Sequence, residues 1–432
     1  MLRTLFLFIA LSAALVMGQN PNEWPVLHNI NHTGFSPTTV LKPPLKLKWA
    51  AKVPGAFKAG PVVAEGKVVI QGREGYLFCF DAETGAPVWR YFVQRMEAHY
   101  MGFTETGPCI RNGRVYANFH SAGHPGISGM RCFDLETGEM LWKKPSGMTE
   151  HRIHYSPQVT HDRLVFCSNR DIANKQSENP ADWVYNAQVQ CWDAFTGDTL
   201  WTFTMATCFF QNTTLLVAGD TIFASIGYRD GNDSGRTVAL DTNGNMLWES
   251  TAYNVCGTTG NIQYFDGKLI IPAGGSQSVR IFNTSDFSIA LNAGNGTAYS
   301  KVNALMNGKY YNRGYGGFAR PFSLNSGQAT PFAGYTAECD VNSGCGAPAA
   351  ANGYIYNVFG GGCGITYPPG STFSPGALFD PGFKIFAQNE AGEIVWWFQD
   401  RSHHCASVAI AYDKLYACAG TEGMVYCFEN AQ

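Results

Sequence analysis

The chain has 432 residues with 48 glycines, an aromatic content of 14% and a net charge of −3. This composition is typical of a turn-rich, all-β protein, and the length is sufficient for one large hydrophobic core. The small negative charge, with no basic run to offset it, argues against a nucleic-acid partner.

The first 18 residues, MLRTLFLFIALSAALVMG, predict a secretory signal peptide. Arg3 precedes an apolar stretch that is too short for a membrane span, and small residues follow it. Because no cysteine stands at the expected cleavage site, we predict no lipid anchor. We therefore expect a secreted or periplasmic chain without a transmembrane span.

One phrase then recurs along the chain, as CFDAETGAPVW at 79–89, CFDLETGEMLW at 132–142 and CWDAFTGDTLW at 191–201. It predicts a β-hairpin in which an aspartate caps the turn, a glycine supplies positive φ and a tryptophan follows on the outgoing strand. A tryptophan in that place can cover the seam against a neighbouring sheet. These residues are Asp81, Gly85, Trp89, Asp134, Gly138, Trp142, Asp193, Gly197 and Trp201.

Looser copies follow. DTNGNMLW has Asp241, Gly244 and Trp248, and QNEAGEIVW has Gln388, Gly392 and Trp396. Two copies are worn: FNTSDFSIALN keeps only Asn283 in the aspartate place, and FSLNSGQATPF keeps Gly327 but has Pro331 in the tryptophan place.

Upstream of each turn lies a second recurrent unit, a glycine or aspartate followed by a β-rich run. Its eight copies begin at 66, 113, 162, 220, 267, 308, 353 and 413. A spacing of about 40 to 60 residues predicts an eight-bladed β-propeller of four-stranded antiparallel blades. The last unit ends at YCFEN without a tryptophan strand, so LKLKWAAKV at 45–53, with Trp49, is predicted to complete the last blade.

On these repeats the chain resembles proteins of the pyrroloquinoline-quinone-like (PQQ-like) repeat type, the quinoprotein alcohol dehydrogenase-like superfamily. The stretch NEWPVLHNINHTGFSP at 22–37 also resembles the lead-in of secreted members. The expected organisation is therefore a signal peptide at 1–18, a lead-in at 19–44 and one eight-bladed propeller at 45–432.

The resemblance leaves two functions open. Its dehydrogenases hold the quinone against a disulfide of adjacent cysteines and bind calcium through Glu, Asn and Asp, but this chain has no adjacent cysteine pair and no CxxCH haem motif. We therefore expect a non-catalytic scaffold, with no required cofactor, that binds a protein or carbohydrate partner. The alternative is a divergent oxidoreductase that uses PQQ and calcium to oxidise an alcohol or sugar.

Binding is expected on one face of the propeller. If strands A to D are counted outward from the axis, the repeated turns join C to D, so the B–C and D–A connections share the opposite face, where the longest segments fall. Loops on a rigid frame are where binding residues concentrate. The candidate residues on this face are Glu105, His154, Lys301, His404, His99, His120, His124, His151, His403, Tyr155 and Trp397.

Two of these candidates, His154 and His404, precede innermost strands and could bind a transition metal, since imidazole is a common ligand. The other interpretation is that the histidines are scattered polar side chains bonded to loop carbonyls, because no compact ligand spacing occurs. Both interpretations stay open.

Ten of the 13 cysteines fall into two groups. Cys79, Cys132, Cys191 and Cys427 occupy the same place in the repeat and are expected to be buried structural thiols. Export invites disulfides: Cys339 and Cys345 are close enough in sequence to bridge a loop, and adjacency of blades alone suggests Cys208 with Cys256 and Cys363 with Cys405.

Overall fold

The structure is a computed structural model. It describes residues 20–54, 57, 59–72, 75–93, 107–119, 129–145, 156–173, 184–206, 208–209, 215–228, 234–250, 253–254, 262–273, 278–293, 303–313, 319–328, 336–338, 347–360, 364–366, 383–400, 405–419 and 423–431. In these ranges the secondary structure is β apart from the 3-10 helix η1 (Ile30–His32). No helix among them is long and apolar enough to cross a membrane.

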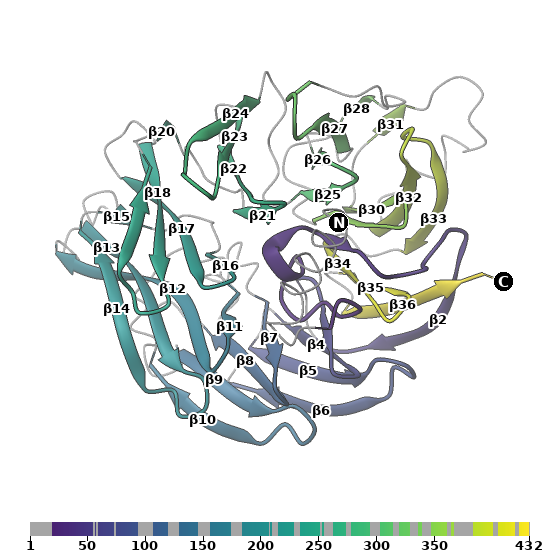
Figure 1. Ribbon diagram of the computed structural model, residues 1–432. Coiled ribbons are helices and arrows are strands. Elements are labelled where there is room, and N and C mark those ends of the chain that lie inside the picture. The colour runs from purple at the N-terminus through teal and green to yellow at the C-terminus, as the bar shows by residue number, and fades with distance from the viewer. Residues whose placement is uncertain are drawn as a thin grey trace, which may run out of the picture.

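The strands form the ring of eight blades that the repeats predict (Figure 1). Blade 1 consists of β3 (Val62–Ala64), β4 (Lys67–Gln71), β5 (Tyr76–Asp81) and β6 (Pro87–Phe92), and blade 2 of β7 (Cys109–Arg111), β8 (Arg114–Phe119), β9 (Gly129–Asp134) and β10 (Met140–Lys144). Blade 3 consists of β11 (Gln158–Thr160), β12 (Arg163–Ala173), β13 (Val184–Asp193) and β14 (Thr199–Met205). Blade 4 consists of β16 (Leu216–Ala218), β17 (Thr221–Tyr228), β18 (Ser234–Asp241) and β19 (Met246–Glu249), with the short strands β15 (Cys208–Phe209) and β20 (Tyr253–Asn254) added.

Blades 5 to 8 continue the ring. Blade 5 consists of β21 (Gln263–Phe265), β22 (Lys268–Ala273), β23 (Ser278–Asn283) and β24 (Ile289–Ala293), and blade 6 of β25 (Ala304–Met306), β26 (Lys309–Arg313) and β27 (Ala319–Ser323). Blade 7 consists of β29 (Ala349–Ala351), β30 (Tyr354–Gly360), β32 (Phe383–Asn389) and β33 (Ile394–Asp400), joined by β1 (Phe35–Ser36). Blade 8 consists of β34 (Cys405–Ala411), β35 (Lys414–Ala419), β36 (Met424–Asn430) and β2 (Leu45–Lys52). A separate pair is formed by β28 (Thr336–Glu338) and β31 (Gly364–Thr366).

The N-terminal strand closes the ring as predicted. β2 pairs antiparallel with β36, from Leu45 opposite Asn430 to Lys52 opposite Met424. One hydrophobic cluster joins Trp49 and residues of blades 7, 8 and 1 across this junction. The two ends of the chain therefore share one blade, and the edge of β36 is covered.

The second recurrent unit is the turn between strands A and B. Glu65 and Gly66, and likewise Asn112 and Gly113, all have positive φ, between 51° and 74°. Positive φ at both central residues is the requirement of a tight type I′ hairpin. The recurrent glycine or aspartate therefore marks the point where the chain reverses from the innermost strand to the next.

The repeated phrase forms the C–D hairpin. The Asp81 carboxylate accepts hydrogen bonds from the Glu83 N–H at 3.1 Å and from the Thr84 N–H and hydroxyl at 2.8 Å each. Gly85 follows with a φ of 72°. The same contacts recur at Asp134, so the turn chemistry fixes where each outer strand begins.

The repeated tryptophan joins each blade to the next. The Trp49 indole N–H donates to the Ala82 carbonyl at 3.2 Å, and Trp89 donates to Leu135 at 2.7 Å. The turn glycine lies against the ring: a Cβ on Gly85 would stand 2.5 Å from Trp49 Cδ2. Glycine is required here both for its positive φ and for the close approach of the indole.

Further tryptophan contacts follow the same rule. Trp142 donates to the Ala194 carbonyl, Trp201 to that of Thr242 and Trp396 to that of Leu45. The last of these joins blade 7 to β2, so the closing strand is held from both sides.

Two of the less regular copies, those of blades 5 and 7, use other residues for the same contacts. In blade 5, Phe287 takes the glycine place with a φ of 56°, and its ring stacks on Trp248 at 4.7 Å between centroids. In blade 7, Gln388 was predicted in the aspartate place, but Asn389 accepts the turn N–H groups of Ala391 and Glu393 at 3.0 Å each. That assignment was wrong because the turn is one residue shorter and Gln388 is buried, donating to the Gly392 carbonyl.

Candidate functional site

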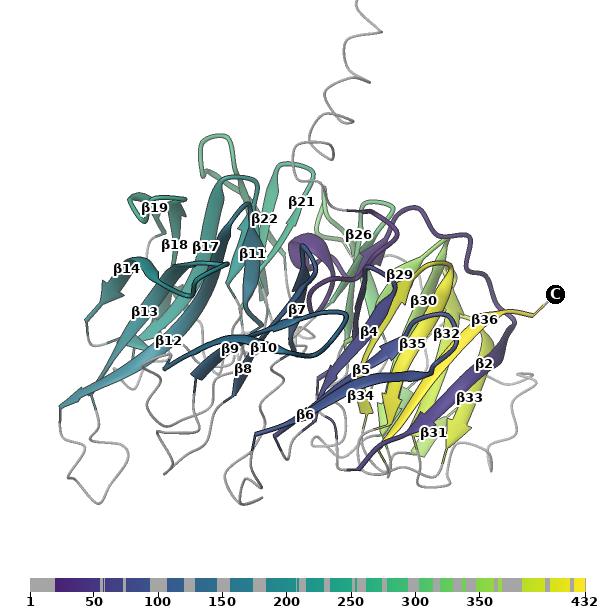
Figure 2. The same cartoon turned by 90° about the horizontal axis from the view of Figure 1, so that it is seen from below.

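The two faces of the ring differ as the repeat predicts. The A–B and C–D turns lie on one face, which we call the turn face, and the strand ends that lead into the B–C and D–A connections point to the opposite face, which we call the long-loop face (Figure 2). All candidate binding residues except Trp397 fall outside the described residues: Glu105, His154, Lys301, His404, His99, His120, His124, His151, His403 and Tyr155. Among the residues that are described, no group of three or more His, Cys, Asp or Glu side chains could hold a metal ion.

Trp397 lies in the middle of β33, the outermost strand of blade 7, where it pairs with Phe386. Its side chain is 37% exposed. This position is on the outer wall of the ring, and a role for Trp397 in binding stays a prediction.

The described site with the most polar contacts lies on the turn face, at the centre of the ring. Residues 22–36, which we call the plug segment, cross the inner ends of the blades (Figure 1). Trp24 exchanges two backbone hydrogen bonds with Val63 of β3, at 2.6 and 2.8 Å, and is 1% exposed. The Pro25 carbonyl accepts the Ile110 N–H of β7 at 2.9 Å.

The other end of the plug segment is bound to the opposite side of the ring. The Thr33 carbonyl accepts the Leu305 N–H at 2.8 Å, and the Gly34 carbonyl accepts the Ala350 N–H at 2.6 Å. Phe35 and Ser36 form β1, parallel to β29. Asn22 accepts the Tyr412 N–H of blade 8 at 3.0 Å, so the segment spans the whole centre of the turn face.

Between these ends, His32 joins three blades. Its Nδ1 lies 3.0 Å from the Ile262 carbonyl at the start of blade 5, and its Nε2 lies 2.6 Å from Gln158 Nε2 in blade 3. The same Gln158 amide donates to the Leu215 carbonyl at 2.8 Å, and its oxygen accepts the Val217 N–H at 2.8 Å in blade 4. One buried imidazole and one buried amide therefore connect the plug segment to blades 3, 4 and 5.

The direction of each hydrogen bond that links His32 and Gln158 to their partners is fixed. A backbone N–H only donates and a backbone carbonyl only accepts, so Val217 and Leu215 determine which end of the Gln158 amide carries the nitrogen. That nitrogen can only donate, so His32 Nε2 must accept, and the proton of the ring must be on Nδ1, facing Ile262. His32 is therefore a neutral imidazole of a single tautomer.

Burial favours the same state. Burial lowers the pKa of His32 to about 4, although its backbone hydrogen bond to Ile262 works against this shift. Burial also lowers the pKa of His28 well below its ordinary value, and the neighbouring His32 ring, 6.3 Å away, lowers it further. Unfolding below pH 6.5 therefore takes up protons, so stability falls as pH drops from about 6.5 towards about 4.

A small cleft of about 30 Å³, open to solvent, lies beside the plug segment. Its walls include Pro25, Val26 and Ile30 of the plug segment and Arg111, Gln158 and Thr160 of blades 2 and 3. Solvent therefore reaches the side of η1 that faces these blades.

These turn-face residues were missed as candidates. The sequence contains a signal for them, because Gln158, Gln263 and Asn303 are amides at or next to the start of an innermost strand, and all three are buried. Gln263 donates to the carbonyls of His32 and Asn303 at 2.6 and 2.7 Å. An amide repeated at this place indicates a segment lying across the inner strands, but the sequence does not say which one.

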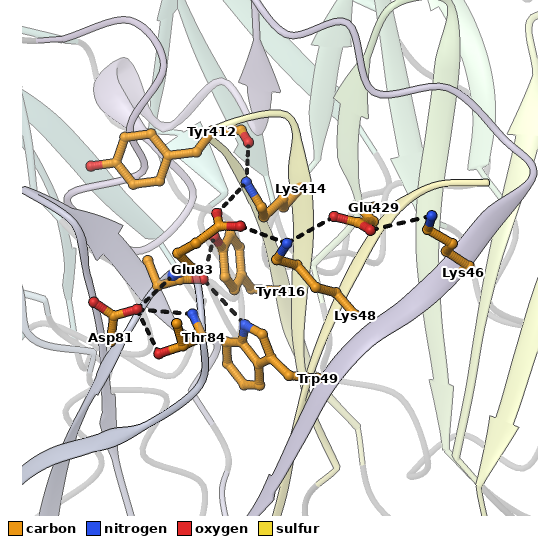
Figure 3. A network of polar contacts seen from close by, with 11 residues as sticks. Lys46, Lys48, Trp49, Asp81, Glu83, Thr84, Tyr412, Lys414, Tyr416 and Glu429 are labelled. Carbon is orange, nitrogen blue, oxygen red and sulfur yellow. Dashed lines mark hydrogen bonds and ion pairs between the residues drawn. The ribbon is translucent and has the colours of Figure 1, made fainter. Parts of the chain in front are cut away.

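A second polar cluster lies at the junction between β2 and blade 1 (Figure 3). The Lys48 ammonium lies 2.5 Å from the Glu83 carboxylate and 3.0 Å from that of Glu429. Lys414 reaches Glu83 at 2.9 Å, and Lys46 reaches Glu429 at 3.4 Å. Hydrogen bonds to Glu83 and Glu429 raise the pKa of Lys48 above its ordinary value, so it stays charged between two blades.

Replacing Lys48 with methionine is expected to lower the free energy of unfolding by about 1 kcal/mol, since the cation that joins two carboxylates is lost while the aliphatic stem stays. Lys46→Met is the matched control. Lys46 contacts one carboxylate and its side chain is 48% exposed, against 22% for Lys48, so its loss should cost less than about 0.5 kcal/mol. Urea unfolding of the two variants measures the difference, and equal effects would contradict a role of this cluster in closure.

The repeat cysteines are buried thiols, as predicted. Cys79, Cys132, Cys191 and Cys427 are free and 0% exposed. Burial raises the pKa of Cys79 and Cys427 to about 12, so these thiols stay protonated. Each of the three predicted disulfides includes at least one residue outside the described part of the chain, and they stay predictions.

Comparisons with known proteins agree with this architecture. The family model described as "Outer membrane protein assembly factor BamB" matches residues 42–174 and 130–292, which together are more than half of the chain. The chain is 26% identical over 188 residues to BamB of Burkholderia pseudomallei (strain K96243), covering 42% of this chain and 44% of that protein. It is 27% identical over 110 residues to polyvinylalcohol dehydrogenase of Sphingopyxis sp. (strain 113P3), covering 23% and 15%.

The matches therefore span less than half the length of these curated relatives. Among solved structures, BamB from Moraxella catarrhalis superposes with a TM-score of 0.59 and 12% identity, over 89% of this chain and 97% of that one. A quinohemoprotein alcohol dehydrogenase from Pseudomonas putida HK5 superposes with a TM-score of 0.68 and 12% identity, over 97% and 81%. At such identities these structures show the fold alone. With the family model and the observed blades taken together, the chain belongs to the BamB family of PQQ-like repeat β-propellers, in the quinoprotein alcohol dehydrogenase-like superfamily.

Proposed function

We propose that this chain is an exported, non-catalytic propeller that binds a protein partner through its long-loop face. The observation that supports this choice of face is the plug segment, which covers the centre of the turn face from Asn22 to Ser36. With short hairpins around that plug, the turn face offers little irregular chain for recognition, whereas the strand ends that point to the other face lead into the longest segments between strands of the sequence.

The family supports a protein partner rather than a carbohydrate. The matching family model and two of the similar curated proteins are described as outer membrane protein assembly factors. A periplasmic or secreted location agrees with those descriptions and with the predicted signal peptide. The partner of this chain is proposed as a protein of the same exported compartment.

Site-specific photo-crosslinking in the native host tests this proposal. A photoreactive amino acid at position 124 or 403, in predicted long-loop segments, should give one discrete crosslinked protein. The matched control places the same amino acid at Glu136, a turn-face residue whose side chain is 67% exposed. A partner captured from position 136 and not from 124 or 403 would overturn the assignment of the binding face.

The second candidate is an oxidoreductase that uses PQQ and calcium to oxidise an alcohol or sugar. One observation favours it, the match to polyvinylalcohol dehydrogenase over part of the chain. The sequence has no adjacent cysteine pair, which the resemblance to quinoprotein dehydrogenases leads one to expect at the quinone site. We therefore derive no reaction step for it.

Incubation with PQQ and calcium, followed by desalting, separates the two candidates. The scaffold should lose the quinone absorbance and show no dye-linked oxidation of alcohols or sugars. Retention of about one equivalent of quinone would favour the oxidoreductase and count against the scaffold.

A further inference from the structure

We propose that the plug segment is an acid-sensitive cover of the turn face. When His32 takes up a second proton from solvent, residues 22–36 leave the inner strands while the eight blades stay folded. This inference is independent of the proposed function, because it concerns the opposite face of the ring.

The first argument is the fixed direction of the hydrogen bonds. A proton added to His32 must go to Nε2, since Nδ1 already carries one, and Nε2 lies 2.6 Å from the nitrogen of the Gln158 amide. The amide cannot turn to present its oxygen, because Leu215 needs a donor and Val217 needs an acceptor in the present positions. A protonated His32 therefore faces a donor at hydrogen-bond distance and must move away from Gln158.

The second argument concerns the charged groups near η1 among the described residues. Of these, His28 faces the His32 ring, and its own protonation would add a like charge 6.3 Å away. His28 Nε2 is buried and has no hydrogen-bond partner among the described residues. The strands packed on η1, β16 and β21, lead into turns whose carboxylates, Asp220 and Asp266, are exposed to solvent, and Arg111 of β7 is a further cation lining the cleft beside Asn31.

The third argument is that the cover is separable from the ring. The blades are closed by β2, which begins at Leu45, outside the plug segment. The plug segment contributes isolated backbone bonds and the two-residue strand β1. Its departure therefore breaks no blade, and it exposes the buried amides of Gln158, Gln263 and Asn303 at the centre of the turn face.

Hydrogen–deuterium exchange of the full mature protein at pH 7.5 and 4.5, corrected for intrinsic exchange rates, tests the proposal. The equilibrium constant for the opening that frees His32 should be larger at pH 4.5 than at pH 7.5, on the order of 50-fold. This follows from a pKa of about 4 in the closed state and about 6.5 in the open state. Faster exchange is expected in peptides covering residues 22–36 and not in those covering β4, β8 or β35. An unchanged plug segment at pH 4.5, or equal acceleration throughout the chain, would overturn the proposal.

Two variants identify the group responsible. His32→Gln removes one proton site and should reduce the pH dependence of exchange in the plug segment, leaving the part that protonation of the buried His28 contributes. Gln158→Glu loses the hydrogen bond to the Leu215 carbonyl, so exchange of the plug segment should rise at pH 7.5. Its further increase at pH 4.5 should be smaller than in the wild type, because a carboxylate there can accept the N–H of a protonated His32. If Gln158→Glu opens with acid as the wild type does, the proposal fails even where His32→Gln has weakened the segment at both pH values.

The matched control is His161→Asn. His161 is an exposed histidine in the A–B turn of blade 3, with a φ of 51° that asparagine tolerates. This variant should retain the wild-type pH dependence of the plug segment, and loss of that dependence would assign the effect to a histidine other than His32.

Discussion

A chain that lacks residues 19–53 is expected to aggregate instead of forming a soluble monomer. The deletion removes β2, which pairs with β36 from Leu45 to Lys52, together with Trp49 and its contacts to blade 1. It exposes the backbone edge of β36, and such an edge pairs readily with other chains. Size-exclusion chromatography with light scattering measures the outcome.

The matched deletion of residues 19–36 removes the plug segment and retains the closing strand. We expect this shorter deletion to give a soluble monomer with a lower melting temperature, because it uncovers the inner strands without opening a blade. If the chain lacking residues 19–53 is instead soluble and melts at the wild-type temperature, β2 is not what closes the ring.

Gly138→Ala is expected to lower the free energy of unfolding by about 3 kcal/mol, whereas Gly113→Ala should cost about 1 kcal/mol. The two glycines belong to the same blade and have nearly the same φ, 71° and 69°. A Cβ on Gly138 would stand 2.6 Å from two atoms of the Trp89 indole, while a Cβ on Gly113 would meet nothing within 4 Å. The left-handed backbone disfavours alanine at both sites, and only Gly138 adds the clash.

Chemical unfolding of both variants measures this difference directly, since the backbone term is shared. The clash requires either the indole of Trp89 to move, which breaks its hydrogen bond to Leu135, or the blades to separate. Equal losses for Gly113→Ala and Gly138→Ala would mean that the junction between blades 1 and 2 adapts to the extra methyl group.

The repeats in the sequence were sufficient to predict the ring. Each copy of the repeated phrase specifies a local turn, and local turns depend on residues that are close in sequence, such as Asp81, Thr84 and Gly85. The prediction of β2 also succeeded, because an eighth unit without an outer strand and a lone strand with Trp49 complete each other. The register failed at Gln388, where a turn shortened by one residue moved the cap to Asn389.

What the sequence by itself determined was therefore the number of blades, the turn chemistry, the burial of the repeat cysteines and the closure of the ring. These features follow from short-range patterns that repeat, so each copy supports the others. Only the tertiary structure decided that residues 22–36 cover the turn face and that His32, Gln158 and Ile262 meet there. The contacts of His32 with Gln158 and Ile262 join single residues more than a hundred positions apart, and a contact made once leaves no periodic pattern in the sequence.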